Sequence, residues 1–166
     1  MVTDTLVSAW RPFFEAVRDV ARVLNREHGP LYFAGALQLE GRPSDEWVFL
    51  VGSQELMRDR GKAIDAVVHT LATSAPREHA DRIRRVDILD ALDPFYLGVS
   101  KSIRQPLGGI TEIQNCRFGD VDVGHMALFV SQPIGNGGMR SKTTRRGQAG
   151  SPRKKASGHK KGRRSE

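Results

Sequence analysis

The chain changes character near residue 135, and this change limits what it can fold into. Residues 136–166 carry 11 of the 26 Lys and Arg residues but only one of the 19 acidic residues. Residues 1–135 therefore hold 15 basic and 18 acidic residues, so they are mildly acidic beside a strongly basic segment. A segment this charged and this poor in apolar side chains cannot bury enough surface to offset the entropy of ordering it. We predict a globular body over residues 1–135 and a disordered basic tail over residues 136–166.

The body has the apolar periodicity of a protein that mixes helices and strands. Apolar residues separated by three or four positions predict an N-terminal helix over residues 6–24. The other predicted elements are strands over residues 31–40, 47–51, 83–89, 110–118 and 121–131, and helices within residues 53–71 and 94–103. We therefore predict an α+β (or α/β) fold. Its mixed, largely antiparallel sheet has about five strands, covered by the N-terminal helix and two further helices.

A few residues set expectations for the helix ends. Pro12 lies inside the first apolar stripe, so that helix either begins near the proline or kinks there. Gly29-Pro30 is expected to end it. Ser53 is expected to cap the second helix and Gly61 to break it. The part that follows is expected to bury the stripe Ala63, Ile64, Val67, Val68 and Leu71.

The composition excludes several classes of protein. No apolar run approaches the roughly 20 residues that cross a bilayer, and the N-terminus lacks the pattern of a secretory signal, so we expect no membrane association. Cys116 is the single cysteine, which excludes an intramolecular disulfide and favours a reducing cytoplasm. The five histidines do not have metal-ligand spacing, so we expect no cofactor.

The composition of the tail suits a polyanionic partner. Its cationic residues are Arg140, Lys142, Arg145, Arg146, Arg153, Lys154, Lys155, Lys160, Lys161, Arg163 and Arg164. Cations on a flexible chain bind phosphates by releasing condensed counterions, which requires no fixed geometry. The tail contains no aromatic residue to stack on bases, so we expect it to bind DNA or RNA without sequence preference.

The last predicted hairpin brings a thiol and an imidazole near each other. A two-residue turn at Gly119-Asp120 would pair Gln114 with His125 and place Cys116 diagonally across from that histidine. Regular alternation would put Cys116 and His125 on the same face of the sheet. A thiol nucleophile also needs a third group that orients its base, and none is apparent. We therefore interpret Cys116 as a buried thiol.

A second group of polar residues follows two predicted strands. Ser53 comes just after one strand, and Asp87 and Asp90 lie on and after another. Together with Asp93, these carboxylates have the chemistry of a Mg²⁺ site, although solvated loop carboxylates are the commoner case. They define the best candidate cleft for an alternative function, that of a small enzyme or ligand-binding domain.

No motif identifies a reaction. The charge distribution favours a non-enzymatic cytoplasmic protein whose tail binds nucleic acid non-specifically. The body would then be an interaction or dimerisation module, with a protein partner or a second copy of the chain. A further alternative is a subunit of a larger protein assembly.

Overall fold

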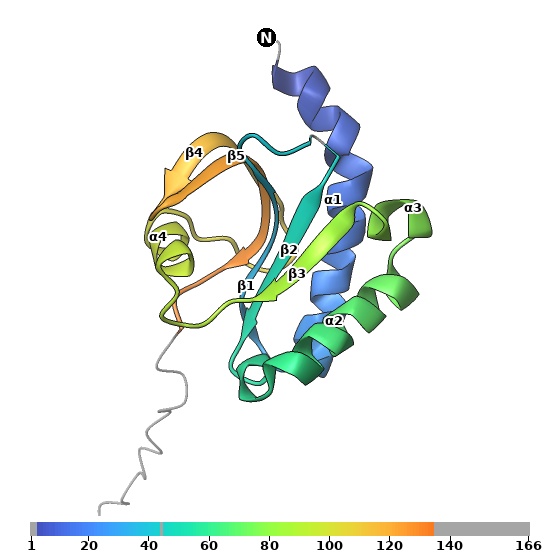
Figure 1. Ribbon diagram of the computed structural model, residues 1–166, viewed down its shortest axis with the longest axis vertical. Coiled ribbons are helices and arrows are strands. Elements are labelled where there is room, and N and C mark those ends of the chain that lie inside the picture. The colour runs from blue at the N-terminus through green and yellow to red at the C-terminus, as the bar shows by residue number, and fades with distance from the viewer. Residues whose placement is uncertain (1–2, 44, 135–166) are drawn as a thin grey trace, which may run out of the picture. The chain divides into compact units, whose positions relative to one another are not determined.

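The computed structural model describes residues 3–43 and 45–134 (Figure 1). In chain order the elements are α1 (Thr3–Glu27), β1 (Leu31–Leu39), β2 (Trp47–Ser53), a 3₁₀ turn (Leu56–Arg58), α2 (Arg60–Ser74), α3 (Arg77–Ala80), β3 (Ile83–Ile88), α4 (Pro94–Ser102), β4 (Thr111–Phe118) and β5 (Val121–Ser131). They form a five-stranded mixed sheet with four α-helices, which confirms the predicted α+β class. The tail predicted over residues 136–166 lies outside the described residues.

The strand order places β1 at the centre of the sheet. The order is β3-β2-β1-β5-β4. β1 pairs antiparallel with both β2 and β5, and β5 pairs antiparallel with β4, so both predicted hairpins are confirmed. β3 runs parallel to β2. A parallel pair needs a crossover connection, and here the crossover contains α2 and α3.

The sheet has a hydrophobic layer on each face. Figure 1 shows α1 and α2 on one side of the sheet and α4 on the other. The α1 side buries Phe13, Phe14, Val17, Val20 and Leu24 of α1 with Trp47, Phe49 and Val51 of β2. The α4 side buries Phe95, Tyr96 and Val99 of α4 with Phe33, Leu37, Met126 and Leu128 of the sheet. We call these the α1 layer and the α4 layer.

The first helix follows the predicted stripe, and of the two alternatives at Pro12 the structure excludes a start near the proline. α1 runs continuously through Pro12, whose side chain is exposed, so the helix begins before the proline. Proline has no backbone N–H, so one bond of the helical ladder is missing there. α1 ends at Glu27, and Gly29 takes a positive φ of 74°, which redirects the chain into β1 as expected from Gly29-Pro30. Within the described part of the chain, no helix combines the length and apolar character of a membrane span.

The start of α2 differs from the prediction. The helix is capped by Asp59, whose carboxylate accepts a hydrogen bond from the Lys62 backbone N–H at 3.2 Å. Ser53 is instead the last residue of β2. Gly61 lies in the first turn of α2 and does not break it. The interruption falls earlier, at Asp59, where the 3₁₀ turn gives way to the helix.

The buried face of α2 is also narrower than predicted. Ala63, Val67 and Leu71 are buried as expected. Ile64 and Val68 are 38% and 49% exposed, which makes the prediction wrong for both. Apolar periodicity marks the residues able to face a core, but tertiary packing decides how wide the covered face is.

The β4–β5 hairpin has the predicted register but not the predicted faces. Gln114 pairs with His125 around the two-residue turn. Asn115 then takes a positive φ of 49°, and the β1–β5 register shifts at the same level. These irregularities interrupt the alternation of side chains on both strands. His125 contacts Phe14 in the α1 layer, whereas Cys116 packs against the α4 layer.

Candidate functional site

The structure places Ser53 at the sheet edge where the parallel strands β2 and β3 end. Its side chain is buried and both hydrogen-bonding roles of its hydroxyl are used. The hydroxyl donates to the His28 carbonyl at 2.9 Å and accepts from the Glu55 backbone N–H at 3.1 Å. Ser53 therefore ties β2 to the end of α1 and to the turn after β2.

The two aspartates predicted beside Ser53 also serve local structure. Asp87 forms an ion pair with Arg85 at 2.9 Å, and Asp90 accepts a hydrogen bond from the Leu92 backbone N–H at 2.8 Å. Asp93, the third carboxylate of this region, is the N-cap of α4. Among the described residues, no group of three or more His, Cys, Asp or Glu side chains is arranged to hold a metal ion.

Tyr32 fills the space beside this edge. A Cβ atom on Gly52 would clash with the Tyr32 ring, so the glycine allows the ring to pack directly on the backbone of β2. The Tyr32 hydroxyl donates to the Leu89 carbonyl at 2.6 Å. Burial, with a smaller contribution from the Asp90 carboxylate, raises the pKa of Tyr32 to about 12.

The thiol–imidazole pair considered from the sequence is not assembled. Cys116 and His125 pack on opposite faces of the sheet because of the irregularity at Asn115. Burial also raises the pKa of the Cys116 thiol, which disfavours the reactive thiolate. Cys116 is half-buried against the α4 layer, so the prediction of a buried thiol is met only in part.

His125 has a different partner. Its Nε2 lies 3.4 Å from a carboxylate oxygen of Glu112, and each side chain is 11% exposed. Glu112 pairs with Ala127 in the hairpin, so it lies diagonally across β4 and β5 from His125. Burial lowers the pKa of His125, while the hydrogen bond and charge of Glu112 act in the opposite direction. The pair is thus a neutral imidazole oriented by a carboxylate.

Aromatic rings enclose the imidazole on the α1 side. The His125 ring centroid is 5.4 Å from that of Phe14 and 5.3 Å from that of Trp47. Trp47 in turn contacts Trp10 at 5.1 Å and Phe13 at 5.2 Å. These rings fix the position of His125 through packing.

A pocket of about 320 Å³ opens beside this cluster. Its lining residues come from α1, the end of β1 with the following turn, and the β4–β5 hairpin: Trp10, Gln38, Leu39, Glu40, Gly41, Arg42, Gln114, Gly124 and His125. We call it the Trp10–His125 pocket. It combines an indole, an imidazole, two amides and one charge of each sign.

Two buried polar atoms near His125 have no hydrogen-bond partner among the described residues. They are Nε1 of Trp47 and Oε1 of Glu112. Buried polar atoms are nearly always paired in native proteins, and leaving one unpaired costs about 1–3 kcal/mol. This concentration of unsatisfied groups distinguishes the surroundings of His125 from the edge that holds Ser53.

The sequence contained a signal for the Glu112–His125 pair. Extending the predicted hairpin register one step beyond Gln114 on the same face places Glu112 diagonal to His125. The contribution of Trp10 and Trp47 was not accessible in this way, because no local pattern relates α1 to the start of β2.

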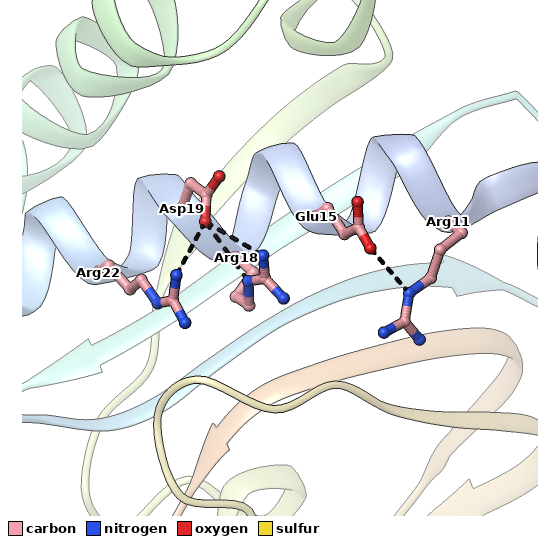
Figure 2. A network of polar contacts seen from close by, with 5 residues as sticks. All are labelled: Arg11, Glu15, Arg18, Asp19 and Arg22. Atoms are coloured by element: carbon pink, nitrogen blue, oxygen red, sulfur yellow. Dashed lines mark hydrogen bonds and ion pairs between the residues drawn. The ribbon is translucent and has the colours of Figure 1, made fainter.

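Three arginines on α1, Arg11, Arg18 and Arg22, lie beside carboxylates of the same helix (Figure 2). Nε of Arg11 lies 3.1 Å from Glu15. Asp19 lies 3.4 Å from both Arg18 and Arg22. Such exposed pairs add little stability, but they balance charge along the helix. The cationic tail residues predicted to bind nucleic acid lie outside the described residues.

His125 should titrate below the ordinary histidine pKa of 6.5. Because its pKa is lowered in the folded state, the unfolded chain takes up the proton first as the pH falls. The stability that the neutral imidazole contributes is therefore complete above about pH 6.5 and is lost as the pH falls toward the pKa of the folded state. Imidazole resonances followed by NMR across the acidic range would measure the midpoint.

Two matched variants complete this measurement. Glu112→Gln removes the carboxylate that raises the pKa of His125, so the midpoint should fall further. Glu27→Gln, at an exposed position at the end of α1, should leave it unchanged. A midpoint at or above 6.5 in the unmodified protein would contradict the assigned direction.

Comparison with known proteins identifies no family for this chain. No protein-family model, curated protein or solved structure matches the chain.

Proposed function

We propose that the protein is a non-enzymatic cytoplasmic protein that binds nucleic acid non-specifically through residues 136–166, while residues 1–135 act as an interaction module. The uneven distribution of charge carries this proposal. Eleven Lys and Arg residues and one acidic residue occupy the last 31 positions, beside a body with more acidic than basic residues. The single cysteine fits a reducing compartment.

The described residues support a binding role for the body more than a catalytic one. The Ser53 hydroxyl is fully engaged, and Asp87 and Asp90 have local partners. Arg11, Arg18 and Arg22 of α1 lie beside carboxylates, so charge complementarity to phosphates favours the tail over this part of the helix. The proposal accordingly assigns the electrostatic contact to the tail.

The test is a mobility shift at low salt with the full chain and three variants. One variant lacks residues 136–166, and a second keeps the full length but replaces the eleven tail cations with Gln. The third shuffles the tail sequence and so preserves its charge. We expect the first two to lose retention of both DNA and RNA and the shuffled tail to keep it, because counterion release depends on the number of cations rather than their order.

Circular dichroism and thermal unfolding would verify that the body is folded in each variant. Retention by the deletion variant equal to that of the full chain would refute the proposal. Loss of retention on shuffling would also refute it, because binding would then depend on a specific tail sequence.

A further inference from the structure

We propose that the Trp10–His125 pocket binds a single unstacked nucleobase. The choice of a base among small planar ligands rests on the proposed function, since a chain held on nucleic acid meets bases at high local concentration. The pocket itself is argued from the described residues alone. Its volume of about 320 Å³ lies at the small end of the range typical of ligand pockets, roughly 300–1,000 Å³.

Trp10 supplies the stacking surface. Its ring is half-buried and lines the pocket. Edge-on contacts with Phe13 at 5.8 Å and Trp47 at 5.1 Å hold the ring in place. The Arg82 guanidinium lies 5.0 Å from the Trp10 centroid but does not line the pocket, so part of the indole is left to a ligand. Aromatic side chains that stack on bases accept any base, because every base has a π-face.

The polar lining can read the edge of a base. Gln114 lines the pocket from β4, and its side-chain amide offers both a donor and an acceptor. Paired donors and acceptors on one amide match the edges of nucleobases. The exposed position of Gln114 leaves its amide accessible from the pocket.

Glu112 determines what His125 presents to the ligand. A carboxylate 3.4 Å from Nε2 accepts a hydrogen bond there, so the proton of the neutral ring resides on Nε2. Nδ1 is then an acceptor. Among the described residues, no hydrogen bond involves Nδ1, and it is not one of the buried unpaired atoms. It can therefore accept from the exocyclic amino group or ring N–H of a base.

The rim of the pocket suits the rest of a nucleotide. Arg42 and Glu40 flank Gly41 in the turn after β1, and all three are exposed. A guanidinium pairs with phosphate oxygens, and a carboxylate accepts from ribose hydroxyls. Inside the pocket, the Trp10 ring is placed to stack on a base and polar groups are placed to bind the edge of the base. On the rim, Arg42 suits the phosphate of a nucleotide and Glu40 suits the ribose.

The experiment uses uncharged nucleosides, which the tail cannot hold by charge. Adenosine, guanosine, cytidine and uridine are titrated separately into the full chain at about 1 M salt, where the Debye length is about 3 Å. Tryptophan fluorescence and the His125 imidazole resonances report occupancy. We expect saturable binding of at least one nucleoside and no saturable change with ribose or benzylamine. Binding of benzylamine without any nucleoside, or no binding of any nucleoside, would overturn the proposal.

Two matched substitutions locate the ligand. Gln114→Ala should weaken nucleoside binding about 5- to 150-fold, the range for loss of one good amide–base pair. Gln54→Ala, an exposed glutamine outside the pocket lining, should leave it unchanged. Equal affinities for both variants would place the nucleoside elsewhere and overturn the proposal.

This test separates the pocket from the tail. Replacing the eleven tail cations with Gln should not change nucleoside binding at high salt. If nucleosides fail to bind while the full chain still retains nucleic acid, only the pocket proposal falls. If nucleosides bind in the pocket while tail removal does not affect retention, only the proposed function of the tail falls.

Discussion

Binding of the full chain to DNA should weaken about 10³–10⁵-fold when the salt concentration rises from about 50 to 200 mM. This range corresponds to roughly 6–10 phosphate contacts, each of which releases condensed counterions. The tail contains 11 Lys and Arg residues, enough to make that number of contacts. Fluorescence anisotropy with labelled duplexes, repeated at several salt concentrations, would give the slope of log affinity against log salt concentration.

Two controls test whether this salt dependence comes from the tail cations. Duplexes of unrelated sequence should give the same affinity and slope, because the tail has no aromatic side chain to interact with bases. The full-length variant with Gln at the eleven cationic positions should give almost no slope. An affinity that barely changes with salt in the unmodified chain would rule out counterion release as the source of binding.

Trp47→Ala should lower the free energy of unfolding by about 3–5 kcal/mol, the cost typical of removing a large buried aromatic ring. Trp47 is 0% exposed and contacts the rings of Trp10, Phe13, Phe14 and His125 at centroid distances of 5.1–5.3 Å. Its removal would leave a cavity between α1 and β2. Urea denaturation followed by circular dichroism would measure the loss as a lower midpoint.

Trp47→Phe is the matched control. It keeps a buried ring but removes the indole N–H, which is unpaired among the described residues. Losing an unsatisfied donor offsets part of the lost packing, so this variant should cost clearly less than Trp47→Ala. Equal losses for the two variants would show that the indole N–H has a partner whose hydrogen bond matters for stability.

Local sequence patterns predicted the sheet hairpins and the first helix well. The turn at Gly119-Asp120 fixed the register of the β4–β5 hairpin, and Gly29-Pro30 marked the end of α1. Such signals depend on neighbouring residues and on backbone conformations that glycine and proline favour or forbid. The buried face of α2 was less predictable because the exposure of Ile64 and Val68 depends on which elements cover them.

The candidate site was harder to predict than the fold. Proximity of strand ends directed attention to Ser53, Asp87 and Asp90, whose local hydrogen bonds could not be foreseen from spacing. Regular alternation also placed Cys116 on the wrong face, because residue spacing does not reveal the positive φ of Asn115 or the register shift between β1 and β5. Glu112, the partner of His125, could by contrast be derived from the hairpin register.

The central position of β1 has a consequence for how the chain is made. Phe33 near the start of β1 pairs with Ser131 at the end of β5, almost a hundred residues later. Synthesis proceeds from the N-terminus, so β1 and β2 can pair early. The other side of β1 stays unpaired until β5 has been synthesised. Through that interval, Ala34, Gly35 and Ala36 present unpaired backbone N–H and C=O groups to any extended chain nearby. A nascent molecule halted before β5 would therefore expose a strand edge able to pair with other extended chains.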